Sequence, residues 1–140
     1  MNYLITGGCG FLGTALVKDL LNNGADSIRI IDNLITGTRD DLEKVTTFKV
    51  LDPSEISGKP DGIELVIGDI VDPSLALLVS QGCNVIIHFA ANTGVAPSVE
   101  DPKLDCMSNV IGTFNYLEAA RVNNINRFII ASSGAPIGNV

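Results

Sequence analysis

Short apolar runs recur along the chain and are separated by polar breaks that contain glycine. Such runs, bounded by turn residues and rich in β-branched side chains, are typical of strands in a buried sheet. We therefore predict five strands, at residues 2–6, 27–31, 63–67, 84–91 and 127–131. The last two show almost no polar alternation, which indicates strands covered on both faces, as in a parallel sheet.

Between the strands, apolar residues return at helical spacing, and capping residues mark the ends of these segments. Pro73, for example, suits the first position of a helix. The pattern predicts a helix from the glycines near residue 10 to about residue 22, a short helix at 40–44, a third from 73 to 81, and a long one at about 102–123. Residues 45–62 contain turn signals and leave room for a short strand or helix.

Strands alternate with helices from end to end, without a break in composition or an internal repeat. Right-handed crossovers then give an α/β fold, a doubly wound parallel sheet with helices on both faces, and we expect one domain over residues 1–140. In the order of the predicted strands, we expect the arrangement 3-2-1-4-5, with the sheet ending after the fifth strand. A ligand should lie at the carboxyl ends, where the order reverses between strands 1 and 4.

Three glycines at spacing G-x-x-G-x-x-G follow the first strand and open the first helix. Gly7 lets the chain leave the strand in a conformation that a Cβ disfavours. Gly10 lets a pyrophosphate approach bare backbone, and Gly13 lets the helix pack closely on the strand. The helix start offers free N–H groups to an anion. This arrangement is typical of a Rossmann-type dinucleotide site, although an ordinary glycine-rich turn has the same pattern.

Polar residues follow several of the predicted strands at their carboxyl ends: Asp32, Asp69, Ser132 and Ser133. Asp32 comes about twenty residues after the last glycine, where an acidic residue accepts hydrogen bonds from the ribose hydroxyls of an adenine nucleotide. Two alternatives stay open. Asp69 caps the turn that follows it, and the two serines satisfy backbone groups at a strand end.

Composition narrows the classes of partner. The formal net charge is −7 and 46% of the residues are hydrophobic, which favours a buried core and disfavours nucleic acid or an anionic membrane as partner. No apolar run has the length of a membrane span, and the start has no basic region or cleavage site, so we expect a cytoplasmic protein. Three widely spaced cysteines predict free thiols, with neither disulfides nor a metal site. Cys9 is a reactive thiol only if it is exposed.

Several motifs together resemble the extended short-chain dehydrogenase/reductase family, and within it the NAD-dependent nucleotide-sugar epimerases and dehydratases. Residues 6–13, T-G-G-C-G-F-L-G, are similar to the family's T-G-G-x-G-F-[IL]-G. Further motifs match in order: D-N at 32–33, G-D-I at 68–70, H-F-A-A at 88–91, N-V-I-G-T at 109–113 and S-S at 132–133.

The resemblance implies NAD as cofactor and a role for each matching residue. Asp69 would meet the adenine amino group, and Ser133 would be the catalytic serine that hydrogen-bonds the sugar hydroxyl being oxidised. For two motif residues an alternative remains: Asn109 pins local backbone, and His88 is a packed core histidine. The cofactor-binding residues that the resemblance implies are Gly7, Gly10, Phe11, Leu12, Gly13, Asp32, Asn33, Asp69, Ile70, Phe89, Ala90, Ala91, Asn109 and Ala131.

The chain departs from the family pattern in two ways. Residues 134–138 read G-A-P-I-G, with Pro136 and Ile137 where the family commonly has Val and Tyr. This variant is similar to one branch, the UDP-glucose 4-epimerase-like sequences. The family's Y-x-x-x-K pair and its C-terminal substrate domain are not among these residues, since neither Tyr3 nor Tyr116 has a lysine four residues later. We therefore expect the NAD-binding part of a nucleotide-sugar epimerase, inactive by itself.

Other functions stay open. Within the family they are a nucleotide-sugar 4,6-dehydratase, a decarboxylase and a 2-epimerase; outside it they are a non-catalytic NAD sensor and an incomplete fragment. As partners the resemblance implies a nucleotide sugar, in the full-length enzyme, and a second copy of the chain, in a dimer through the helix at 102–123. The edge of the fifth strand and an exchanged tail at 133–140 are alternative contacts.

Overall fold

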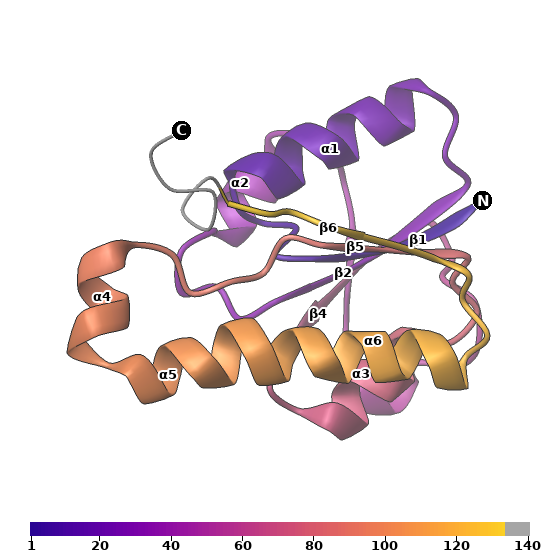
Figure 1. The fold of residues 1–140 in the computed structure, drawn as a ribbon. Helices are drawn as coiled ribbons and strands as arrows, with labels where there is room; N and C mark the ends of the chain where they lie inside the picture. Colours follow the sequence, from indigo (N-terminus) through magenta and orange to yellow (C-terminus); the bar gives the residue numbers. More distant parts are fainter. Residues whose placement is uncertain (134–140) are drawn as a thin grey trace.

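The structure is a computed structural model that describes residues 1–133. At its centre lies one six-stranded sheet, in which all neighbouring strands are parallel (Figure 1). The strands are β1 (Asn2–Thr6), β2 (Ser27–Asp32), β3 (Lys49–Leu51), β4 (Ile63–Ile67), β5 (Val85–His88) and β6 (Arg127–Ile130). Their order across the sheet is β3-β4-β2-β1-β5-β6.

This order confirms the predicted topology, because the five predicted strands correspond to β1, β2, β4, β5 and β6. β3 is an additional strand beside β4 at the edge of the sheet. It has only three residues, two of them exposed, so it is too short to show an alternation of apolar and polar residues in the sequence. β5 ends at His88, three residues before the predicted boundary, because the chain there turns away along the ends of the strands.

Helices cover both faces of the sheet (Figure 1). α1 (Phe11–Asn22) and α2 (Arg39–Glu43) lie on one face, and α3 (Pro73–Val79) and α6 (Thr113–Val122) lie on the other. A 3₁₀ turn, Pro53–Glu55, follows β3, and α4 (Val95–Glu100) lies in the connection after β5. Within residues 1–133, none of the helices combines the length and the apolar character that a bilayer crossing needs.

The long predicted helix is present but is not α-helical throughout. α5 (Pro102–Cys106), a π-helical segment (Met107–Gly112) and α6 follow one another directly and form one rod in Figure 1. The rod passes close to the loop after β4, since a Cβ on Gly112 would lie 2.6 Å from Cδ1 of Ile70. A π-turn of this kind is common beside functional sites, and apolar periodicity alone does not reveal it.

The two faces of the sheet form two separate apolar clusters. Successive residues of a strand point to opposite faces, so Ile30 belongs to one cluster and Ile31 to the other. Ile30 shares its cluster with Val17 of α1, whereas Ile31 shares its cluster with Val79 of α3 and Tyr116 of α6. Both clusters therefore depend on the helices that the alternating sequence pattern predicts.

A buried ion pair crosses two neighbouring strands away from the carboxyl ends. Arg29 of β2 donates from Nε to Oε2 of Glu64 of β4 over 2.7 Å, and the two side chains are 1% and 6% exposed. The Arg29 guanidinium also donates to the carbonyl oxygens of Val79, the last residue of α3, and of Gln81 just past it. The second Glu64 oxygen accepts from the backbone N–H of Asp61. The pair thus joins the sheet, a loop and a helix end.

Replacing Glu64 with leucine should lower the free energy of unfolding by about 3 kcal/mol, because it leaves the Arg29 charge buried without a counter-charge. Urea denaturation of Glu64→Leu against the parent chain measures this loss. The matched control is Asp61→Asn, which breaks the exposed pair between Lys49 and Asp61 and should leave the unfolding midpoint unchanged. Equal effects of the two variants would contradict the role given to the buried pair.

Candidate functional site

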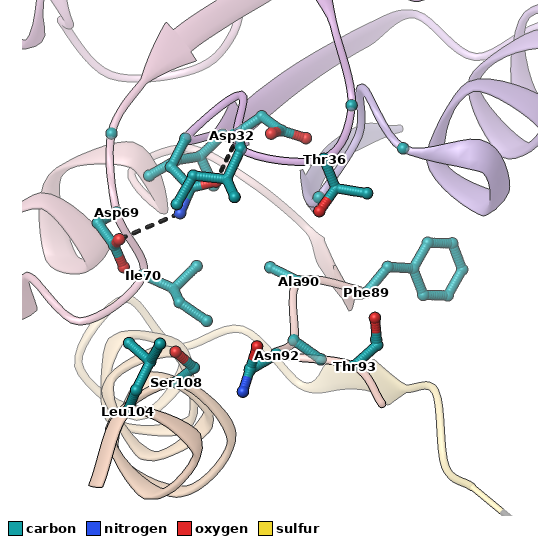
Figure 2. Close-up of a pocket in the computed structure, with 18 residues that line it drawn as sticks. Asp32, Thr36, Asp69, Ile70, Phe89, Ala90, Asn92, Thr93, Leu104 and Ser108 are labelled. Carbon is teal, nitrogen blue, oxygen red and sulfur yellow. Dashed lines mark hydrogen bonds between the residues drawn. The ribbon is translucent and has the colours of Figure 1, made fainter. Parts of the chain in front are cut away.

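A cavity of about 320 Å³ lies at the carboxyl ends of the strands. The loops after β1, β2, β4 and β5 form most of its wall, and Leu104 and Ser108 of the long rod close one side (Figure 2). The strand order reverses here, since β1 lies between β2 and β5. The cavity therefore occupies the crevice in which doubly wound sheets bind their ligands.

The structure brings most of the sequence-predicted residues together in this wall and leaves the others outside it. The predicted residues that line the cavity are Gly7, Gly10, Asp32, Asn33, Asp69, Ile70, Phe89, Ala90 and Ala91. Those that do not line it are Phe11, Leu12, Gly13, Asn109, Ala131 and Ser133. Residues 134–138, the variant motif of the sequence analysis, and the tail beyond them lie outside the described residues.

Sequence reasoning missed the remaining lining residues. They are Ile31, Ile35, Thr36, Gly37, Gly68, Asn92, Thr93, Leu104 and Ser108. A signal was available for Gly37, a glycine in the loop after the second strand, where a Cβ would lie 2.3 Å from the carbonyl carbon of Cys9. Leu104 and Ser108 had none, because only the path of the rod brings them to the strand ends.

The glycine turn is a place of close backbone contact. Gly7 has a φ of +70°, and a Cβ there would lie 2.8 Å from the backbone nitrogen of Ala90. At Gly13 a Cβ would lie 2.3 Å from the carbonyl oxygen of Gly7. Gly10 differs, since its Cβ would meet only that same oxygen, at 3.3 Å. The fold itself therefore excludes side chains at Gly7 and Gly13, whereas at Gly10 it leaves room that opens on the cavity.

Gly10 is also the N-cap residue of α1, and no side chain caps this helix end. The first N–H groups of a helix have no partner within the helix. They directly follow Gly10, which lines the cavity, and the positive end of the helix dipole lies at this end of α1. Phe11 and Leu12 begin the helix with side chains that are 89% and 56% exposed, so any contribution from them to this wall comes from backbone.

Asp32 holds two loops of the site together. Its two carboxylate oxygens accept from the backbone N–H groups of Cys9 and Leu34, each over 2.9 Å, and the residue is only 8% exposed. Each oxygen keeps a lone pair for a ligand hydroxyl. The neighbouring Cys9 is buried, and desolvation, together with the Asp32 charge, raises the pKa of its thiol to about 12. The condition for a reactive Cys9 is therefore not met.

Asp69 and Asn33 join the ends of β4 and β2. Asn33 donates from its side-chain amide to Oδ2 of Asp69 over 3.1 Å, one of the bonds drawn in Figure 2. The other Asp69 oxygen accepts from the backbone N–H of Val71, which is the turn-capping contact of the alternative interpretation. Asp69 therefore caps its turn and lines the cavity at the same time.

Asn109 lies in the π-helical segment and pins the loop after β5. Its side-chain oxygen Oδ1 accepts from the backbone N–H of Asn92 over 2.8 Å, and its side-chain amide nitrogen donates to the Asn92 carbonyl oxygen and to Asp105, each over 2.9 Å. These contacts belong to the backbone-pinning alternative. Asn92 itself lines the cavity, so Asn109 acts on the site by holding the backbone of Asn92 in place.

His88 ends β5 beneath the cavity and is only 2% exposed. Its ring stacks on Tyr116, with ring centroids 5.5 Å apart, and hydrogen-bonds to the hydroxyls of Thr6 and Thr113. These contacts fit the packed core histidine of the sequence analysis. Desolvation by burial lowers the pKa of His88 from 6.5 to about 4. No group of three or more potential metal ligands occurs within residues 1–133.

The end of β6 lies apart from this wall. Ala131 and Ser133 follow the strand and are exposed, and Ala131 donates its backbone N–H to the carbonyl oxygen of His88. Within the described residues, the cavity thus offers backbone donors, two carboxylates and an apolar side made by Ile31, Ile70 and Leu104. This is an arrangement for binding a ligand that carries both an anionic group and hydroxyls.

Comparisons with known proteins agree with this arrangement. The family model described as "NAD dependent epimerase/dehydratase family" matches residues 3–140. A putative UDP-glucose 4-epimerase of Methanocaldococcus jannaschii is 36% identical over 135 residues, which are 96% of this chain and 38% of that protein. The chain thus spans well under half the length of this curated relative.

Two solved structures extend the likeness to three dimensions. The UDP-glucose 4-epimerase of Thermus thermophilus, in complex with NAD, has a TM-score of 0.77 and 32% identity, over 96% of this chain and 38% of that one. The UDP-glucose 4-epimerase of Thermotoga maritima, with UDP-glucose, has a TM-score of 0.79 and 28% identity over the same shares of the two chains, 96% and 38%.

The lowered pKa of His88 makes stability depend on pH. Between pH 6.5 and about 4 the unfolded chain binds a proton that the folded chain does not, so stability is full above pH 6.5 and falls as the pH drops through this window. We expect a loss of about 3 kcal/mol from this group. Urea denaturation across the window should show a shallower loss for His88→Gln, which does not titrate. Parallel pH profiles for both chains would contradict the assignment.

Proposed function

The chain belongs to the NAD dependent epimerase/dehydratase family, and from this premise we propose that it is the NAD-binding part of a nucleotide-sugar epimerase of the UDP-glucose 4-epimerase type. One observation carries the proposal. The cavity combines an uncapped helix start at a bare glycine with a carboxylate at the end of the next strand. An anionic pyrophosphate and a ribose need these two features at neighbouring positions.

The residues of the cavity fit each part of NAD. Gly10 and the first N–H groups of α1 would hold the pyrophosphate, since no side chain caps that helix end. Asp32 would accept hydrogen bonds from the adenosine ribose, and Asp69 would accept from the adenine amino group with Ile70 beside it. Three further predicted residues, Phe89, Ala90 and Ala91, would border the nicotinamide end.

NAD supplies a hydride acceptor, so a sugar carbon can be oxidised transiently and reduced again from the other face. In this reaction Ser133 would hold the sugar hydroxyl. A base must take the hydroxyl proton, and general acid–base catalysis of this kind is worth about 10²–10⁴-fold in rate. The Y-x-x-x-K pair that supplies it in the family is not among these residues, so we propose that the 140-residue chain binds NAD without epimerising a sugar.

The family description also includes dehydratases, and this is the second candidate. Both reactions begin with the same oxidation by NAD, so the cavity supports either one. The names of the relatives above favour the epimerase. A UDP-hexose is the substrate that this proposal implies for the full-length enzyme.

Gly10 provides the direct test of NAD binding. Gly10→Val should raise the Kd for NAD at least about a hundredfold, because the side chain occupies the space of the pyrophosphate. Its backbone, with φ −75° and ψ 176°, accepts any residue, so the fold should stay cooperative. Isothermal titration calorimetry measures the affinity and thermal unfolding checks the fold.

The contrasting variant is Gly13→Val, which should unfold the chain because a Cβ there overlaps backbone. If the Gly10 variant binds NAD as the parent does, the glycine turn is an ordinary structural turn and the proposal fails.

Asp32 should select NAD over NADP by at least about tenfold, or about 1.4 kcal/mol, because its carboxylate repels a 2′-phosphate. Asp32→Ala should weaken NAD binding and reduce the difference between the affinities for NAD and NADP. The control is Asp40→Ala, which removes the same charge from an exposed position of α2 outside the cavity. Calorimetry measures both affinities. If the parent chain binds the two dinucleotides equally well, Asp32 does not contact the adenosine ribose.

A second copy of the chain is the partner that we propose for the rod. Val110, Phe114 and Leu117 lie three to four residues apart, on one side of the rod, and are 59%, 59% and 48% exposed. Residues at this spacing share a helix face. On the other side, Tyr116 and Ala120 are buried against the sheet. An apolar face of this kind marks a contact surface.

Sedimentation velocity at micromolar concentrations should therefore show self-association of the parent chain. Phe114→Glu should shift the chain to monomer by placing a charge within the apolar face. The control, Val50→Glu, changes an exposed apolar residue at the opposite edge of the sheet and should leave association unchanged. A parent chain that sediments as a monomer at every concentration would contradict the proposed dimer.

A further inference from the structure

Four hydrogen bonds form a continuous line beneath the cavity. Thr6 and His88 are paired in register at the ends of β1 and β5, and their side chains meet at 2.8 Å, between Oγ1 and Nδ1. On the other side of the ring, Nε2 lies 3.1 Å from Oγ1 of Thr113 in α6. Thr113 is 2.8 Å from the backbone carbonyl oxygen of Asn109, and Thr6 is 3.1 Å from the backbone nitrogen of Ala90.

The chemistry of the two ends fixes the direction of every bond between them. A carbonyl oxygen only accepts, so the Thr113 hydroxyl donates its one proton to Asn109. Thr113 must then accept from His88, which places a proton on Nε2. At the other end the Ala90 N–H donates to Thr6, and the Thr6 hydroxyl is free to donate to Nδ1. A neutral ring with its proton on Nε2 satisfies all four bonds.

Protonation of Nδ1 as well would leave one donor of this line without an acceptor. An imidazolium donates from both nitrogens, so Thr6 would receive from His88 and from Ala90, and the Thr6 proton would lose its acceptor within the described residues. The groups that pack against the ring are Tyr116 of α6, stacked on it, and Phe128 of β6, with its centroid 6.0 Å away. Neither carries a counter-charge for an imidazolium, and the lowered pKa of His88 has burial as its cause.

We propose that His88 is a positioning residue which, as a neutral imidazole with its proton on Nε2, ties the walls of the NAD cavity to one another through this line of hydrogen bonds. The NAD part of this inference rests on the function proposed above. None of Thr6, His88 and Thr113 lines the cavity. Thr6 and His88 directly precede the lining residues Gly7 and Phe89, whereas Thr113 reaches the lining residue Asn92 through Asn109.

The two ends of the line of hydrogen bonds reach different segments around the cavity, the glycine turn at one end and the rod at the other. Thr6 immediately precedes Gly7 of the glycine turn, and it holds Ala90 of the loop after β5. Thr113 leads into the rod at Asn109, whose own side chain grips the backbone of Asn92. The imidazole ring of His88 therefore fixes the positions of the glycine turn, the loop after β5 and the rod relative to one another. A shift of the ring should move both ends of the loop from 90 to 92.

The tautomer is directly measurable, because the chain contains one histidine. In long-range ¹H–¹⁵N correlation spectra of the ¹⁵N-labelled chain at pH 7, we expect a pyridine-type signal for Nδ1 and a pyrrole-type signal for Nε2. The spectrum needs no NAD. A pyrrole-type Nδ1, or averaged signals from a mixture of tautomers, would overturn the proposal.

Thr113 provides the variant pair that separates positioning from mere packing. Thr113→Val keeps the shape but removes both the acceptor and the donor, whereas Thr113→Ser keeps them. We expect the valine variant to speed hydrogen exchange of the Ala90 amide about tenfold and to raise the Kd for NAD about fivefold. The serine variant should stay within about twofold of the parent in both, as should the control, Thr46→Val, at a half-buried site outside the line.

The outcomes separate this proposal from the proposed function. If the parent chain binds no NAD, the function fails, and the tautomer and the Ala90 exchange rates decide the inference by themselves. If NAD binds and the serine and valine variants behave alike, the line of hydrogen bonds does not position the walls and the inference is wrong. Should the valine variant not fold, the tautomer and the serine variant still decide.

Discussion

Close contact between backbone segments at the carboxyl ends of β1 and β5 is the constraint on which the rest of the structure depends. No Cβ fits at Gly7, against Ala90, or at Gly13, against Gly7 itself. The first contact lets the loop after β5 lie directly on the glycine turn, and the second lets α1 start there, directly after the lining residue Gly10. Larger side chains at these positions would separate the walls and remove the cavity.

Polar side chains around the cavity act mainly by holding backbone. Asp32 bonds to Cys9 and Leu34, Asn109 grips Asn92, and Thr6 holds Ala90. Each of these bonds fixes a segment that would otherwise be an unsupported loop. The surface left for a ligand is therefore mostly backbone, with carboxylate oxygens and a few apolar side chains. Such a surface suits a large nucleotide, because it is already arranged before the ligand arrives.

Sequence patterns predicted five of the six strands because each of these is a short, mostly apolar run bounded by polar breaks, and each crossover has one favoured hand. The residues that follow β2 and β4 were predictable for the same reason, since parallel strands bring their ends to one edge. Leu104 and Ser108 were not, because their place depends on the path of the rod. The π-turn that carries Asn109 has no apolar period of its own, and β3 is only three residues long. Site residues at the ends of strands were thus easier to predict than those that depend on packing between elements.

The separation of the two apolar clusters has a consequence for how mutations combine. Ile30 and Ile31 are neighbours in sequence, yet the thickness of the sheet lies between their side chains and they share no cluster. Their truncations should therefore be thermodynamically additive, whereas Ile31 and Tyr116, far apart in the sequence, belong to one cluster and should show coupling. For this chain, distance along the sequence is a poor guide to epistasis, and the face of the sheet is the better one.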